Sequence, residues 1–185
     1  MKLKYLALPL AGLFAVFFCL LLLVALLFAS DEDGGGGGIY YGGANLSAAV
    51  LAHRPMVERY AAQYGISEYV NVLLAIIQVE SGGTLEDVMQ SSESMGLPPN
   101  SLDTESSIRQ GCKYFSELLA KADRLDCDLD SVIQAYNYGG GFLDYVASHG
   151  SKYSFALAQA FAEEKSGGVR VTYKNEISIA ENGGW

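Results

Sequence analysis

The sequence predicts an all-α domain, or nearly so, built as a compact bundle of about six helices. Apolar residues recur at helical spacing in several stretches after residue 45. Small polar residues, glycines and a proline stand where these stretches begin or end, as they do at helix caps and breaks. The alternation typical of a strand is found only at Val169 to Tyr173. The helical stretches are too mixed in length for a simple up-and-down bundle.

The first helical stretch runs from Leu46 to Tyr64, and Pro55 interrupts it. We therefore expect either a pair of helices or one bent helix, which ends at Gly65. Ser67 can cap the next helix, which is apolar over a broad surface and should be mostly buried. The apolar residues of that helix are Val70, Leu73, Leu74, Ile76, Ile77 and Val79.

A polar segment from Gly82 to Leu102 predicts a long loop, with a short turn near residues 88–91, because it contains glycines, two prolines and many serines. Loops of this length in a compact domain tend to be functional. Asp103 or Thr104 should cap the helix that follows. Further helices are expected at residues 129–136, 142–147 and 153–165.

Residues 1–30 predict a short cytoplasmic stub and a membrane anchor, because Lys2 and Lys4 precede an apolar run long enough to span a bilayer. Acidic residues 31–33 follow, so the rest of the chain should lie on the extracytoplasmic, cell-wall side of the membrane. A cleaved signal peptide is the alternative, although the apolar run exceeds the usual length. Residues 31–43, with five consecutive glycines, predict a flexible tether, and residues 44–185 the folded domain.

Charge, histidines and cysteines exclude several classes of protein. The chain has a formal net charge of −9 and shows no basic face, so we expect no nucleic-acid partner. His53 and His149 show no ligand spacing, so we expect neither a metal nor another cofactor. Cys112 and Cys127 can form one disulfide on the exported side of the membrane, or they are two small buried hydrophobic residues.

Glu80 is the most informative position, because it ends an apolar run and is followed at once by Ser81 and two glycines. The apolar residues before it imply a low local dielectric constant, which raises the pKa of a carboxyl group. The C-terminal end of a helix raises that pKa further through its negative dipole end. Such a group keeps its proton near neutral pH, as a general acid must. An exposed glutamate at the end of its helix is the ordinary alternative.

Two later segments supply groups suited to binding a saccharide. The loop "VMQSSES" carries Gln90 and Ser91, and "AYNYGGG" places Tyr136 and Asn137 before a glycine turn. Amides and hydroxyls can bond the hydroxyl and acetamido groups of a sugar, and aromatic faces can cover the apolar side of its ring. Taken singly, Tyr136 would more often be a core aromatic residue and Asn137 a helix-ending residue.

The order of these motifs resembles that of the lysozyme-like lytic transglycosylases of the goose-type lysozyme superfamily. It resembles more closely the lysozyme-like domain of the two-domain cell-wall hydrolases encoded on conjugative transposons of Gram-positive bacteria. The matching stretches read "LLAIIQVESGG", "DVMQSSESMGLPPN", "SIRQGCKYF" and "QAYNYGGGFLDYV", and the resemblance covers residues 50–185. It implies a lysozyme-like fold and a glycosidase or lytic transglycosylase activity on peptidoglycan.

The resemblance also implies roles for residues and partners. Glu80 would be the catalytic acid that protonates the oxygen between N-acetylmuramic acid (MurNAc) and N-acetylglucosamine (GlcNAc), and Tyr136 would orient or shield it. The implied substrate-binding residues are Ser81, Gln90, Ser91, Tyr136 and Asn137. The domain would open the cell wall for conjugative transfer machinery, with type IV secretion components as partners. Relatives often carry a cysteine peptidase domain after this one.

Two products are compatible with the sequence. A hydrolase needs a second carboxylate, for which Asp87 is the candidate, with Glu86 and Glu93 behind it. A lytic transglycosylase needs none, because the sugar's own hydroxymethyl group attacks and leaves an anhydro ring. Outside the enzymes, the alternative is a glycan-binding module of a cell-envelope secretion assembly, in which Glu80 is structural.

Overall fold

The computed structural model describes residues 46–167. Within this range the chain forms helices and turns and contains no strand, so the all-α prediction is confirmed there. None of the helices between residues 46 and 167 is long and apolar enough to cross a membrane. The predicted anchor, the predicted tether and the strand-like stretch from Val169 to Tyr173 lie outside the described residues.

The first lobe consists of α2 (Ala48–Ala52), α3 (Arg54–Gln63), the 3₁₀ helix η1 (Ser67–Tyr69) and α4 (Val70–Glu80). Pro55 lies in the first turn of α3, where its missing N–H costs no hydrogen bond, so the predicted pair of helices is confirmed. The predicted cap at Ser67 is wrong. Ser67 begins η1, and α4 follows that turn directly, with Tyr69 at its N-cap and no side-chain hydrogen bond.

The helix α5 (Thr104–Leu125) is the longest in the described region. Asp103 caps it by accepting a hydrogen bond from the Ser106 N–H at 2.8 Å, as predicted. The long loop before α5 contains a 3₁₀ helix, η2 (Ser91–Met95), which begins where the predicted turn should end. Gln90, just before η2, has a left-handed backbone with φ 47°, and this conformation turns the chain into η2.

The second lobe consists of α6 (Leu129–Tyr138), α7 (Gly141–Ala147) and α8 (Phe155–Ser166), close to the predicted ranges. Asp128 caps α6 by accepting a hydrogen bond from the Ser131 N–H at 3.1 Å. The same carboxylate accepts from the Tyr153 N–H at 3.1 and 3.2 Å, which ties the segment before α8 to the start of α6. Phe142 and Phe161 pack edge to face between α7 and α8, with ring centroids 5.2 Å apart.

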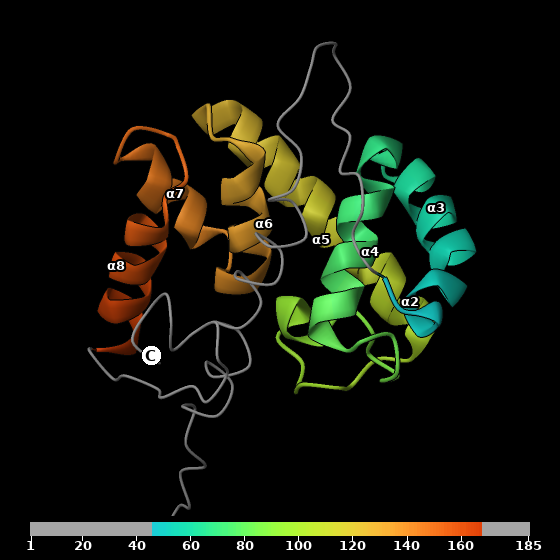
Figure 1. Cartoon of the computed structure of the whole chain (residues 1–185). Coiled ribbons are helices and arrows are strands. Elements are labelled where there is room, and N and C mark those ends of the chain that lie inside the picture. The colour runs from blue at the N-terminus through green and yellow to red at the C-terminus, as the bar shows by residue number, and fades with distance from the viewer. Residues whose placement is uncertain (1–45, 168–185) are drawn as a thin grey trace, which may run out of the picture.

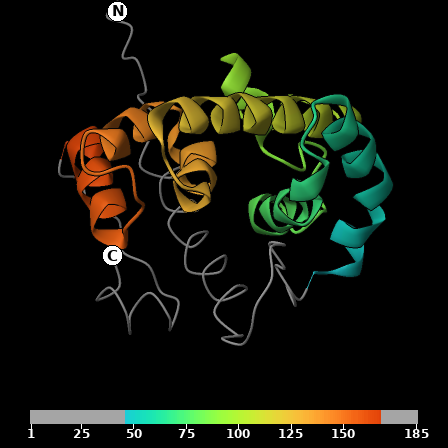
Figure 2. The ribbon, with the colours of Figure 1, turned by 90° about the horizontal axis from the view of Figure 1, so that it is seen from above.

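Figure 1 shows the two lobes on opposite sides, with α5 running between them. Figure 2 shows α5 along one face of the molecule, with helices of both lobes extending from it toward the same side. α5 packs against α3 in the first lobe and against α6 and α7 in the second. One long helix therefore positions both lobes relative to each other.

The two cysteines within the described range are free thiols, so of the two alternatives the disulfide is not formed. Cys112 is the buried residue that the other alternative expects, whereas Cys127 is only partly buried. Cys112 is fully buried on α5, and burial raises its thiol pKa to about 12. The Cys127 thiol is partly exposed before α6 and makes a weak hydrogen bond to the Leu143 carbonyl at 3.6 Å.

Candidate active site

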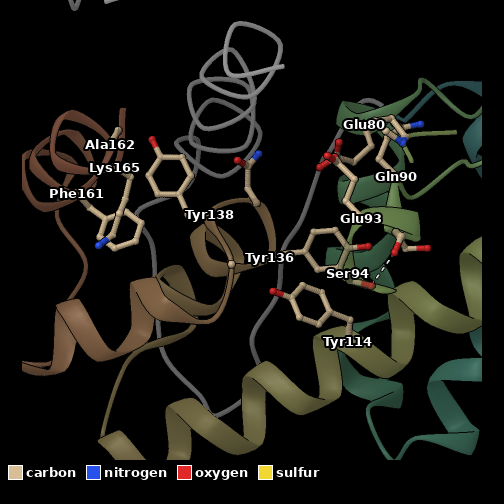
Figure 3. Close-up of a pocket in the computed structure, with 14 residues that line it drawn as sticks. Glu80, Gln90, Glu93, Ser94, Tyr114, Tyr136, Tyr138, Phe161, Ala162 and Lys165 are labelled. Carbon is tan, nitrogen blue, oxygen red and sulfur yellow. Dashed lines mark hydrogen bonds between the residues drawn. The ribbon is translucent and has the colours of Figure 1, made fainter. Parts of the chain in front are cut away.

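A pocket of about 500 Å³ lies between the two lobes, with residues of both lobes on its walls. Figure 3 shows Glu80 and Glu93 on one side of it and residues of α8 on the other. The residues that line the pocket are Glu80, Gln90, Ser91, Glu93, Ser94, Pro99, Tyr114, Tyr136, Asn137, Tyr138, Gly139, Phe161, Ala162 and Lys165. The pocket therefore combines two acids, four aromatic rings and side-chain amides.

Glu80 is the last residue of α4, and only 9% of its surface is exposed. Burial, together with the nearby charges of Glu93 and Asp87, raises the pKa of its carboxyl group to about 8, and burial is the largest of these causes. The carbonyl end of α4 also disfavours a negative charge at this position. Glu80 thus stays protonated at neutral pH and can act as a proton donor inside the pocket.

Glu93 is the second acid on the pocket wall, at an exposed position of η2. Burial raises its pKa, and the charge of Asp87 raises it further. The pKa of Glu80 is raised as well, to about 8. Because Glu93 is the more exposed of the two acids, it ionises more readily, and the pair can hold one proton and one negative charge near neutral pH.

Asp87, predicted as the second catalytic acid, does not line the pocket. Its carboxylate is fully buried and accepts hydrogen bonds from the N–H groups of Ser91 and Ser92, at 3.0 and 3.3 Å, and from the Ser107 hydroxyl at 2.6 Å. The Ser107 oxygen in turn accepts a hydrogen bond from the Met89 N–H at 3.0 Å. Asp87 thus fixes the loop that carries Gln90 and Glu93, while Glu93 lines the pocket together with Glu80.

Ser81 does not line the pocket either. Its hydroxyl donates a hydrogen bond to the Val88 carbonyl at 2.8 Å and accepts one from the Gly83 N–H at 3.0 Å. These bonds hold the end of α4 against the loop. Gln90 does line the pocket, and its amide nitrogen donates to the Asp87 carbonyl and to the Asn100 side chain, both at 2.8 Å.

Three more of the predicted residues line the pocket: Ser91, Tyr136 and Asn137. The Ser91 hydroxyl donates to the Ser107 carbonyl at 2.9 Å, so it secures η2 to α5. The Tyr136 hydroxyl donates to the Met89 carbonyl at 3.0 Å, and burial raises its pKa well above the usual value, with the charge of Glu80 acting in the same direction. Tyr136 therefore stays neutral and joins α6 to the loop of the first lobe.

Asn137 differs from these residues because both polar atoms of its side chain are buried without a hydrogen-bond partner in the described structure. A buried amide without partners costs free energy unless a ligand or water satisfies it. Asn137 is thus the lining residue best placed to gain hydrogen bonds from a bound molecule.

Glu93, the reserve candidate for the second carboxylate, lines the pocket. The sequence did not point to several other residues of the pocket, namely Tyr114, Tyr138, Phe161, Ala162 and Lys165. Tyr138 is within two residues of Tyr136 and could have been found by extending that motif. Phe161 and Lys165 are one helical turn apart on α8, which is a spacing shared by every amphipathic helix. No sequence signal distinguishes them from residues of an ordinary surface helix.

Within residues 46–167 no group of three or more histidine, cysteine, aspartate or glutamate residues could hold a metal ion. The chemistry available from these side chains is acid–base chemistry: a protonated carboxyl group beside an ionisable one, in a pocket with aromatic faces and amides. Such a set can protonate an oxygen that bridges two groups. It can also stabilise the positive charge that develops on the atom from which this oxygen departs.

Comparisons with known proteins show what the chain is similar to. A family model described as lysozyme-like matches residues 47–185. The bifunctional muramidase/DL-endopeptidase CwlT of Bacillus subtilis is 46% identical over 110 residues, which are 59% of this chain and 32% of that protein. The uncharacterized membrane protein YocA of the same organism is 38% identical over 114 residues, which are 61% of this chain and 51% of that protein.

Among solved structures, a protein from Staphylococcus aureus described as similar to a lipoprotein of the NLP/P60 family matches with a TM-score of 0.76 and 64% identity. The match covers 77% of this chain and 48% of that one. The chain spans 32% and 51% of the lengths of the two curated relatives, so its likeness is to one part of each.

Proposed function

Because the chain belongs to the lysozyme-like family, we propose that its domain cleaves peptidoglycan glycan strands at the β-1,4 bond between MurNAc and GlcNAc. The observation that carries this proposal is Glu80, a carboxyl group whose pKa is raised to about 8 on the wall of a pocket rich in aromatic residues. The muramidase activity named for CwlT supports the same substrate.

In the proposed reaction, Glu80 gives its proton to the bridging oxygen as the bond from that oxygen to the MurNAc anomeric carbon breaks. The GlcNAc side leaves as an alcohol, and positive charge develops on the MurNAc ring. The ionised Glu93, on the same wall of the pocket as Glu80, stabilises that charge, and Asn137 forms hydrogen bonds with the sugar. The pocket gives both acids access to one bound strand.

We favour hydrolysis over anhydro-ring formation, because Glu93 supplies the second carboxylate that a hydrolase uses. Glu93 would accept a proton from the water that attacks the anomeric carbon. Proton exchange with solvent then restores a neutral Glu80 and a charged Glu93. Asp87, the candidate from sequence, would act by holding the loop on which Glu93 stands. Lytic transglycosylation is the competing outcome.

The proposal extends to the location of the domain. Residues 1–30 would anchor the chain in the cell membrane and residues 31–43 would tether the domain on the cell-wall side. One relative is named a membrane protein, which supports this arrangement. Opening the wall for conjugative transfer machinery, with type IV secretion components as partners, is the biological role that we propose on the resemblance alone.

The test is to incubate the purified full-length chain with intact peptidoglycan and to weigh the released muropeptides by mass spectrometry. Wild type and Glu80→Gln are compared, with Glu117→Gln on the exposed face of α5 as a control for loss of one carboxylate. Muropeptides with reducing ends, from wild type and Glu117→Gln only, are expected for a hydrolase. Products lighter by one water would identify a transglycosylase.

Release of nothing by folded wild-type protein would refute the enzymatic proposal. Saccharide binding that Glu80→Gln leaves unchanged, without any turnover, would instead favour a glycan-binding module. Circular dichroism of each variant separates these results from a failure to fold.

A further inference from the structure

We propose that Lys165, on the α8 wall of the pocket, binds a carboxylate on the muramyl side of the glycan and thereby selects the substrate and its orientation. This inference rests on the proposed function, because it specifies which saccharide the same pocket accepts. It concerns the wall opposite the two acids, to which the sequence motifs assigned no role.

Lys165 belongs to a small aromatic platform formed by α6 and α8. Its amino group lies 5.2 Å from the centre of the Phe161 ring, one helical turn earlier on α8. The Phe161 ring stacks on Tyr138 of α6, with centroids 5.8 Å apart and planes 20° apart. All three residues line the pocket, and Figure 3 shows them across it from Glu80 and Glu93.

Glu93, which ionises more readily than Glu80, and Lys165 on the facing wall carry opposite charges. Glu80 and Glu93 are the acids that line the pocket in the described structure, and Lys165 is the basic residue that does so. Its partner is the neighbouring Glu164, 2.8 Å away, and the two side chains are 51% and 57% exposed. An ion pair this exposed stabilises little. A lysine ammonium group carries three hydrogen-bond donors, so Lys165 can also donate to a second anionic partner on the pocket side.

The chemistry of the substrate explains why a cation would be useful there. GlcNAc is a neutral sugar, whereas MurNAc carries a lactyl group that ends in a carboxylate or continues into a peptide with carboxylates of its own. A carboxylate is repelled by the acidic wall and attracted by Lys165, so one orientation of the strand is favoured. The apolar faces of Tyr138 and Phe161 can receive the alkyl part of the lactyl or peptide group.

The experiment compares initial rates of the full-length chain and its Lys165→Met variant on three soluble substrates. These are glycan strands with peptides attached, strands whose peptides have been removed so that lactyl carboxylates are free, and either strand with its carboxylates converted to methylamides. Lys165→Arg tests whether charge alone restores function. Lys113→Met is the matched control, because it removes a lysine from an exposed pair with Glu117 on α5.

We expect Lys165→Met to raise KM about tenfold on strands with free carboxylates, the lower end of the range for a hydrogen bond to a charged group, and to leave kcat within about twofold. On methylamidated strands the KM of the wild-type chain should be about as high as that of Lys165→Met on strands with free carboxylates. Lys165→Met should not raise the KM on methylamidated strands further. Lys165→Arg should recover most of the loss, and Lys113→Met should match wild type. A loss on peptide-bearing strands only would identify a peptide carboxylate as the ligand of Lys165. A loss on peptide-free strands only would identify the lactyl carboxylate, and a loss on both would show that either carboxylate can bind.

An equal effect of Lys165→Met on free and methylamidated strands, or no effect on either, would overturn the inference while leaving the proposed cleavage intact. A wild-type chain that cleaves none of the three substrates would instead refute the proposed function. Circular dichroism and the Lys165→Arg variant separate both results from misfolding of α8.

Discussion

Glu80 illustrates how a single carboxyl group acquires a function from its position. Burial and two neighbouring negative charges keep its proton on at neutral pH, although it lines a pocket that a ligand can enter. This proton affects folding as well. Between the ordinary pKa of 4.5 and the raised value of about 8, the folded chain keeps a proton that the unfolded chain has lost. The contribution of Glu80 to the free energy of unfolding therefore falls as pH rises through that range.

The pH dependence of activity tests the charge state of this site. We expect kcat/KM to fall as pH rises through about 8, because Glu80 then loses the proton it must donate. Glu93→Gln removes one of the negative charges that hold this proton, so the fall should move to lower pH. Pre-steady-state or initial-rate profiles on peptidoglycan measure both.

Glu117→Gln serves as the control, because Glu117 lies on the exposed face of α5 and pairs only with Lys113 among the described ion pairs. Its pH profile should match that of wild type. An unchanged profile for Glu93→Gln would contradict the electrostatic coupling between the two acids.

The helices of the fold were largely predictable from sequence, whereas the side-chain hydrogen bonds that connect distant segments were not. Helical periodicity and the cap at Asp103 located α5, and the residue types around Glu80 predicted a buried acid. The role of Asp87 depends on Ser107, twenty residues away, whose hydroxyl meets it only in the folded chain. A loop acid that is fully buried looks the same in sequence as one in solvent.

Gly111 of α5 lies close to Met89 of the site loop and to Tyr136 of α6. A Cβ added there would lie 2.5 Å from the Met89 sulfur and 2.8 Å from the Tyr136 hydroxyl oxygen. Alanine favours a helix over glycine by about 1 kcal/mol, but overpacking a core costs about 1–3 kcal/mol. We expect Gly111→Ala to lower the free energy of unfolding by about 1 kcal/mol, because the crowding outweighs the helix propensity.

The same substitution should reduce activity, because the displaced Tyr136 hydroxyl loses its bond to the Met89 carbonyl beside Glu80. Gly141→Ala is the control, since Gly141 begins α7 and has open space around its Cβ position. Chemical denaturation and peptidoglycan turnover measure the two effects. Wild-type activity and a raised Tm in Gly111→Ala would show that Met89 can move aside at no cost.

At the scale of the whole molecule, the two lobes are held together by packing on α5, and no disulfide links them within residues 46–167. The cysteines within residues 46–167 are both free, one in the core on α5 and one before α6. The pocket between the lobes accordingly depends on noncovalent contacts such as the bond from Tyr136 of α6 to the loop after α4.

Reduction should therefore leave stability unchanged. We expect the same Tm with and without reductant in a Cys19→Ser background, because Cys19 lies outside the described residues. Thiol labelling should reach Cys127 in the folded chain and Cys112 only after unfolding, since burial raises the Cys112 pKa to about 12. A Tm several degrees lower in reductant would instead reveal a disulfide.

The length of α5 limits which insertions and deletions this domain can accept. Its 22 residues span about 33 Å, with the loop carrying Glu93 attached near its start and the second lobe near its end. One residue added between Gly111 and Leu118 would rotate the second lobe by about 100° relative to the first and separate the two walls of the pocket. Seven residues would nearly restore the direction but widen the gap by about 10 Å. The length of the middle of α5 therefore sets the width of the strand that the domain can hold.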